Sequence, residues 1–202
     1  IKKCPLPQSY ETMDDVEVFK TLGKGLFYAQ EQILAHRLRL KQKGMIELYD
    51  EQGRHLTDYK TNGKRVLSVS ICMPEYDFFT ERQMVERILE VGRTGTFHAY
   101  DENRESSLNG LNGRLERIRK LMAQLNDEKQ VEHRAFFNSL FFSLQQIWMI
   151  LHFSDEIEDF LGICSTLAYV THGTGDVYAE IREAVRLKQM RHKMNGYQLI
   201  ET

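Results

Sequence analysis

The segment from His172 to Asp176 (HGTGD) holds the residues best suited to chemistry in this chain. Backbone amides at the start of a helix can bind an anion, and glycine lets a ligand approach the backbone closely. Histidine side chains can act as acids or bases near neutral pH, so His172 could serve as either. The spacing predicts a candidate anion-binding site formed by His172, Gly173 and Gly175. The alternative is a plain connector between two helices, in which Asp176 caps the second helix and competes for the same amides.

The established patterns of catalytic and metal sites are missing from the sequence. The chain contains neither the P-loop pattern nor GxGxxG, and its seven His residues form no HExxH pair. Cys4, Cys72 and Cys164 stand far apart and form no CxxC pair, which argues against a zinc ribbon or a redox dithiol. Gly23-Lys24-Gly25 lies between two helical patterns, which predicts a hinge and not a phosphate-binding loop. We therefore expect no catalytic residue, no metal site and no cofactor.

Basic side chains crowd three of the predicted helices, and the last helix carries the densest group. The candidate contacts to nucleic acid or to an acidic partner are Arg182, Arg186, Lys188, Arg191 and Lys193. Lys and Arg are common near helix C-termini because they complement the helix dipole, so a solvated surface is the simplest interpretation. Phosphate contacts with nucleic acid and docking on an acidic protein are the alternatives. The acidic segment 155–159 could itself neutralise this helix, within the fold or in a dimer.

Composition sets only broad limits on the class of protein. The chain has 202 residues, of which 42% are hydrophobic, which is enough to bury a core. The formal net charge of −2 gives no global attraction to nucleic acid or to acidic membranes. Isolated cysteines fit a reduced environment, so we expect an intracellular, cytoplasmic protein.

The most apolar stretch runs from Ala135 to Phe153 and holds no Asp, Glu, Lys or Arg. On a helical wheel its side chains form one broad apolar face and a second, narrower stripe, which predicts a single helix packed on two sides. Phe137, Leu144 and Trp148 lie on the broad face, and we expect Trp148→Ala to cost roughly 3–5 kcal/mol. A membrane span is the alternative, but Gln, Asn, Ser and His interrupt the run and acidic residues follow it. We therefore expect no membrane span.

Periodicity and punctuation predict the remaining elements. Helices are expected at about 12–22, 26–43, 81–91, 112–126, 155–170 and 177–194, and strands at 45–49, 54–60, 65–73 and 96–100. Gly44, Gly92 and Asn195-Gly196 are the expected helix ends. The apolar seam from Leu108 to Leu125 has the spacing of a coiled coil. We expect this seam to pack inside the chain, with self-pairing of two copies as the alternative.

The order helix, three strands, helix in residues 26–91 resembles the topology of a double-stranded-RNA-binding domain. The second of these helices is net acidic, whereas RNA binding by that domain needs basic residues at its start. No family is identified on this likeness.

We expect an α+β fold in two parts, which could also form one continuous domain. Residues 1–107 should form a small three- to four-stranded antiparallel meander with flanking helices. Residues 108–202 should form a helical hairpin or bundle around the buried aromatic helix. The leading hypothesis is a non-enzymatic intracellular interaction or regulatory protein that works through helical surfaces, with a homodimer as one form. The alternatives are a nucleic-acid-binding regulator that uses the basic last helix, and an enzyme or anion-binding protein that uses the 172–176 loop.

Overall fold

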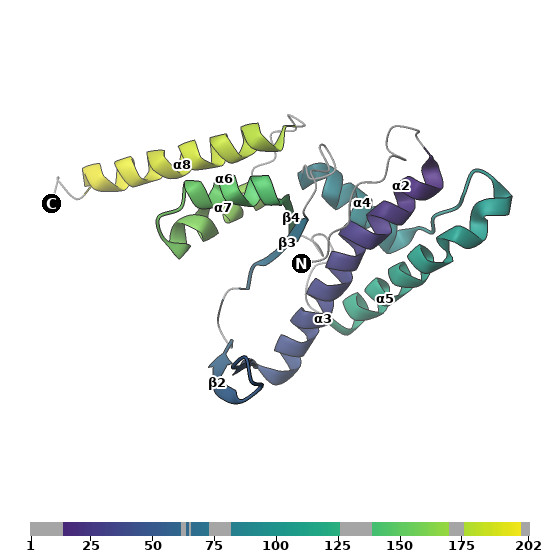
Figure 1. Cartoon of the computed structure of the whole chain (residues 1–202). Helices are drawn as coiled ribbons and strands as arrows, with labels where there is room; N and C mark the ends of the chain where they lie inside the picture. Colours follow the sequence, from purple (N-terminus) through teal and green to yellow (C-terminus); the bar gives the residue numbers. More distant parts are fainter. Residues whose placement is uncertain are drawn as a thin grey trace. The chain divides into compact units, whose positions relative to one another are not determined.

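The computed structural model describes residues 14–61, 64, 66–72, 82–125, 139–169 and 176–198 (Figure 1). These residues form a helix-rich α+β protein with two sheets of two strands each, so the predicted mixture of helix and sheet is confirmed. The chain divides into two compact units. The α3–α5 unit comprises Ser9–Ser68 and Gly92–Ala135, and the α6–α8 unit comprises Ile1–Gln8, Val69–Val91 and Phe136–Thr202. Segments from both sides of the predicted boundary at residue 107 contribute to each unit.

A long, unbroken helical segment opens the α3–α5 unit. It consists of α2 (Asp15–Leu22), one π-helical segment (Gly23–Phe27) and α3 (Tyr28–Lys43). The predicted hinge at Gly23-Lys24-Gly25 is wrong, because this segment stays helical. A Cβ atom on Gly23 would lie 3.1 Å from Leu111 Cδ1, so glycine here allows the two helices to pack closely.

Helix α5 (Asn109–Leu125) follows a 3₁₀ segment at Glu102–Leu108. Its apolar seam packs inside the same unit. The buried side chains of this seam are Leu108, Leu111, Leu115, Ile118 and Met122. The expectation that the seam packs within the chain is therefore confirmed. Helix α3 is its main neighbour, and buried Phe27 and Leu34 supply the facing apolar surface.

The predicted strand at 96–100 is wrong, because the backbone there bonds to side chains instead of to a neighbouring strand. The side-chain amide of Asn112 accepts from Phe97 N at 3.0 Å and donates to Phe97 O at 2.8 Å. The carboxylate of Glu105 accepts from Ala99 N at 2.8 Å. The ring of Phe97 packs with its centroid 4.7 Å from that of Phe19, which anchors the segment.

A solvent-exposed hairpin follows α3. Gly44 ends the helix in the left-handed conformation, with φ of 67°, as predicted. Strand β1 (Met45–Tyr49) pairs antiparallel with β2 (His55–Lys60), and every residue of β2 is exposed. The turn between them is held by Asp50, whose carboxylate accepts from Gln52 N and Arg54 N. The flanking helices expected beside the strands therefore do not bury β2.

The predicted three- to four-stranded meander does not form among the described residues. Strand β3 (Ser68–Cys72) pairs with β4 (Ser139–Ser143) and not with β2. Asn62 and Gly63, which separate the predicted strands at 54–60 and 65–73, lie outside the described residues. The order of elements that resembles an RNA-binding domain therefore does not produce the three-stranded sheet of that domain.

The stretch 135–153, predicted as one helix, divides into a strand and a helix. Its second half is α6 (Leu144–His152), which starts at Ser143 because this residue has extended φ and ψ and forms a capping box with Gln146. In β4, Leu140, Phe141 and Phe142 are all buried, so both faces of this short strand are covered. A continuous apolar run of this length does not distinguish a doubly buried strand from a buried helix, which explains the error.

Three further helices complete the fold. Helices α7 (Ile157–Tyr169) and α8 (Val177–Gln198) belong to the α6–α8 unit, and the third is α4 (Arg82–Thr94). Gly92 does not end α4, since the helix continues to Thr94. A Cβ at Gly92 would lie 2.5 Å from Phe27 Cε1, so this close contact favours glycine here. Asn195-Gly196 does not end α8 either, since the helix continues to Gln198.

Candidate interaction surface

One face of α6 presents large apolar side chains to solvent. Leu144, Trp148 and Leu151 are 44%, 74% and 51% exposed. Their spacing of four and three residues places them on one side of the helix. Ile147 and Ile150, which lie outside this stripe, are buried in the unit. The expectation that Leu144 and Trp148 belong to the core is therefore wrong; Phe137 lies outside the described residues.

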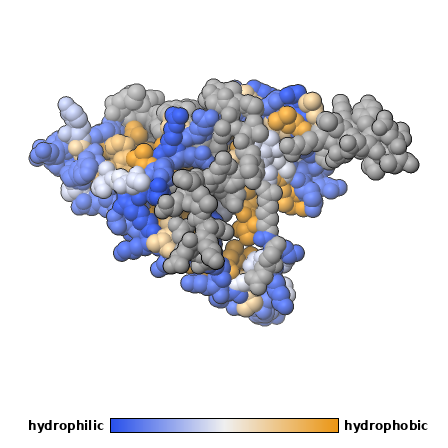
Figure 2. All heavy atoms as spheres, turned by 180° about the vertical axis from the view of Figure 1, so that it is seen from behind, coloured by the Kyte–Doolittle hydropathy of each residue, from blue (hydrophilic) through white to orange (hydrophobic). Residues whose placement is uncertain are grey.

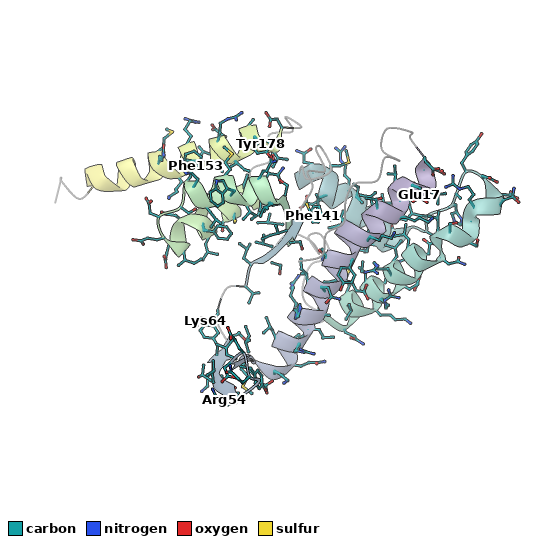
Figure 3. The ribbon with its side chains drawn as sticks, in the orientation of Figure 1. Glu17, Arg54, Lys64, Phe141, Phe153 and Tyr178 are labelled. Atoms are coloured by element: carbon teal, nitrogen blue, oxygen red, sulfur yellow. The ribbon has the colours of Figure 1, made fainter. Side chains whose placement is uncertain are left out.

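The apolar surface continues along the chain into the turn after α6 and the start of α7. Phe153, Ile157 and Leu161 are exposed there, and Figure 3 labels Phe153 at the end of α6. We call the six residues the Trp148 face: Leu144, Trp148, Leu151, Phe153, Ile157 and Leu161. Other hydrophobic side chains are visible among hydrophilic ones on the face that Figure 2 draws. Single exposed apolar residues are ordinary on protein surfaces, but six of them within 18 residues of chain are unusual and make this segment the candidate interaction surface.

Acidic side chains border the Trp148 face at the turn between α6 and α7. Asp155, Glu156 and Glu158 are exposed, and none of their carboxylates pairs with a residue that the structure describes. Asp159 differs, because its carboxylate accepts from Lys188 at 2.5 Å and from Asp155 N at 3.0 Å. The hydrogen bond from Lys188 lowers the pKa of Asp159 from its ordinary value of 3.8.

Three basic residues of α8, Arg182, Arg186 and Lys188, lie near carboxylates in the same unit. Lys188 pairs with Asp159, as noted, so the expectation that the 155–159 segment neutralises this helix is confirmed at one position. Arg186 forms a two-pronged pair with Glu183, which raises the pKa of this guanidinium. Arg182 lies 3.8 Å from Asp176. Arg191 and Lys193 belong to α8, but their side chains lie outside the described residues.

The three arginines of α5 also have partners within their own unit. Arg114 and Arg117 both contact the Glu31 carboxylate, at 3.0 and 2.7 Å. Arg119 donates to backbone carbonyls at the C-terminal end of α4, including Arg93 O at 2.9 Å and Gly92 O at 3.1 Å. These arginines therefore tie α5 to its neighbours and contribute to the fold.

The predicted anion site at His172, Gly173 and Gly175 lies outside the described residues. Asp176 caps α8, with its Oδ1 accepting from Tyr178 N at 2.9 Å and Ala179 N at 3.1 Å. The predicted capping role of Asp176 is confirmed. Two of the amides that an anion would use at this helix start are thus already engaged by a carboxylate.

Thiols and buried polar groups of the described residues offer little chemistry. Burial raises the pKa of the Cys164 thiol to about 12, which keeps it protonated and unreactive at neutral pH. The Cys72 thiol donates to Phe142 O at 3.3 Å inside the unit. A cavity beside Phe141 and Glu180 has room for about one water molecule. No group of three or more His, Cys, Asp or Glu suited to a metal ion occurs in the described part of the chain.

Sequence reasoning missed the Trp148 face although one signal for it was present. The pattern Ser143-x-x-Gln146 is a capping box, and it marks the start of a helix inside the apolar stretch. A helix that begins at Leu144 has only nine residues, and it can bury one side while the other stays open.

Among the helices of the described residues, none has the length and apolar character needed to span a membrane. No protein-family model matches the chain, and curated proteins and solved structures give no significant match.

Proposed function

We propose that this chain is a non-enzymatic interaction protein that binds a protein partner through the Trp148 face. The observation that carries the proposal is that Trp148, in the middle of an apolar face of α6, is 74% exposed. Burying a large apolar side chain stabilises an association by roughly 1.5–3 kcal/mol, so exposed Trp148, Leu151 and Ile157 represent a large unused driving force. Tryptophan is also the residue type most enriched among the strongest contacts of protein interfaces.

The scaffold beneath this face supports such a role. Ile147 and Ile150 of α6 are buried in the unit, and the capping box at Ser143 fixes where the helix starts. The Tyr178 hydroxyl donates to Gln145 Oε1 at 3.2 Å, which links α6 to the first turn of α8 (Figure 3). A face held on a packed helix loses little conformational entropy when a partner binds it.

The proposal is tested by photo-crosslinking inside cells that produce the protein. A photoreactive phenylalanine analogue replaces Trp148, and a matched control carries it at exposed Glu102 of the other unit. We expect a discrete crosslinked product from position 148 and none from position 102, with mass spectrometry identifying the partner. Absence of a product at position 148, or the same products from both positions, would overturn the proposal.

Nucleic-acid binding through α8 is the second hypothesis from the sequence, and it stays a prediction. Its signature is an affinity that falls steeply with salt and falls further when Arg186→Glu and Arg191→Glu are combined. Arg186 already holds Glu183 in a two-pronged pair, and Lys188 holds Asp159, so these cations would have to exchange partners to reach phosphates. The interaction proposal needs no such exchange and is therefore preferred.

A further inference from the structure

The acidic turn beside the Trp148 face lies close to the point where α8 passes its neighbours. Gln145 near the start of α6 bonds to Tyr178 near the start of α8, so α6 and α8 begin at the same end of the unit. Lys188 pairs with Asp159 near the start of α7, so α7 runs in the opposite direction along α8. Residues of α8 that follow Lys188 therefore soon pass the end of both neighbouring helices.

Helix lengths support this conclusion. The 22 residues of α8 span about 33 Å, whereas the 9 of α6 and the 13 of α7 span about 14 and 20 Å. Figure 1 shows α8 extending past α6 and α7 toward the C-terminus. We call residues 190–198 the α8 arm. Met190, its first residue, is 46% exposed.

The composition of the α8 arm complements the Trp148 face and its acidic border. The arm carries two fixed positive charges, Arg191 and Lys193, together with Met190 and Met194 at a spacing of four residues. The face offers apolar side chains next to three exposed carboxylates, Asp155, Glu156 and Glu158. One chain thus contains both a basic, methionine-bearing helix end and an acidic, apolar surface that suits it.

We infer that the partner of the Trp148 face is a second copy of this chain, joined by reciprocal exchange of the α8 arms. This inference rests on the proposed function and names the partner for the same surface. The arm starts beside the acidic turn of its own copy, since Lys188 already contacts Asp159. Two copies that meet end to end with antiparallel arms therefore place each arm against the acidic turn of the other. The arrangement has two-fold symmetry and closes on itself.

A dimer in which two Trp148 faces meet directly is less favourable. Such a contact brings the carboxylates at 155, 156 and 158 of both copies toward one another, and like charges in an interface oppose association. Exchange of the arms instead sets two cations of each copy against three carboxylates of the other. The electrostatic part of this association weakens as salt is added, because exposed charges are screened over about 8 Å at physiological ionic strength.

The test uses charge reversal on the full chain, followed by mass measurement with light scattering. One variant combines Glu156→Lys with Glu158→Lys at the turn, and the other combines Arg191→Glu with Lys193→Glu in the arm. We expect the wild type to form a dimer and each variant alone to dissociate, with its dimer dissociation constant raised about tenfold or more. Mixing the two variants should restore the dimer, because in the mixed pair every arm again faces a turn of opposite charge.

The control carries Glu51→Lys with Glu102→Lys, which gives the same charge change as the turn variant at exposed sites of the other unit. It should dimerise as the wild type does, and circular dichroism should show that every variant is folded. A wild type that stays at the monomer mass of 23.8 kDa at all concentrations, or a mixture that fails to form a mixed dimer, would overturn the inference. A monomer whose position 148 crosslinks to another protein would remove the second copy as partner and leave the proposed function standing.

Discussion

At the scale of single residues, Trp148 and Ile150 on α6 should have different roles, the first in binding and the second in the stability of the fold. Trp148 is 74% exposed, whereas Ile150 is fully buried two residues later. The cost of truncating a large side chain depends on the cavity that it leaves, and an exposed side chain leaves none. We therefore expect Trp148→Ala to change the free energy of unfolding of the monomer by less than about 1 kcal/mol. This value replaces the much larger cost expected when Trp148 is placed in the core.

Ile150→Ala is the matched variant in the same helix. It should lower the free energy of unfolding by roughly 2–5 kcal/mol, because Ile150 is fully buried. Urea denaturation followed by circular dichroism measures both variants at a protein concentration that keeps the chain monomeric. Equal losses for the two variants would show that Trp148 belongs to the core and would remove the binding surface.

The ion pair between Lys188 and Asp159 gives a pH-dependent prediction. The hydrogen bond from Lys188 lowers the pKa of Asp159, so the folded state favours the ionised carboxylate. The resulting stability is present above the ordinary pKa of 3.8 and is lost as the pH falls through the lowered value. Asp159→Asn keeps an acceptor for the amides of Asp155 and Glu156 but removes the charge.

We therefore expect Asp159→Asn to be less stable than the wild type at pH 7 and equal to it at a pH well below 3.8, where the wild-type carboxyl is protonated. Urea denaturation at several pH values measures the difference. A stability gap that does not change between neutral and strongly acidic pH would show that the charge of Asp159 contributes nothing.

At the scale of elements, two glycines in helices have opposite roles. A Cβ on Gly92 would lie 2.5 Å from Phe27 Cε1 and 3.0 Å from Leu115 Cδ2, whereas a Cβ on Gly110 meets nothing within 4 Å. Gly92→Ala should therefore lower the free energy of unfolding by roughly 1–3 kcal/mol through overpacking. Gly110→Ala should raise it by up to about 1 kcal/mol, since alanine favours helix more than glycine does.

Thermal denaturation of the two alanine variants measures this contrast directly. A neutral or stabilising Gly92→Ala would mean that α4 does not approach Phe27 closely at this position. A destabilising Gly110→Ala would mean that the start of α5 is not a regular helix. Either result would require a different packing of the α3–α5 unit.

Elements with strong local signals could be predicted from the sequence. Gly44 ends α3 in the left-handed conformation, the Asp50 turn joins β1 to β2, and Asp176 caps α8. In each case a side chain or a glycine settles the backbone conformation within a few residues. The burial of the α5 seam also follows from its spacing, because only one face of that helix is apolar.

Elements that depend on distant partners could not be predicted. Strand β4 forms because β3, about 70 residues earlier in the chain, supplies its backbone partners. An apolar run alone cannot indicate whether such a partner exists. The wrong assignment of Trp148 to the core has the same cause. A helical wheel that includes the residues of β4 places the wrong side of α6 in the core. The basic residues of α8 were visible in the sequence, but the pairs that Lys188 and Arg186 make were not.

At the scale of the whole molecule, the two units have different surfaces. In the α3–α5 unit, arginines of α5 pair with Glu31 and with backbone carbonyls, so these charges serve the fold. In the α6–α8 unit, Trp148 is 74% exposed, and the exposed carboxylates of Asp155, Glu156 and Glu158 form no ion pair with the described residues. The α6–α8 unit is therefore the part of the chain that we expect to bind.

The chain has one tryptophan, so its fluorescence reports on the binding surface without added labels. Acrylamide quenching of Trp148, measured over a series of protein concentrations, tests directly whether this face is open in one chain and covered in the pair. The account predicts strong quenching at high dilution and protection, with a blue-shifted emission, as the concentration rises. Protection that is complete at the highest dilution would show that the chain itself covers Trp148, and it would contradict the account.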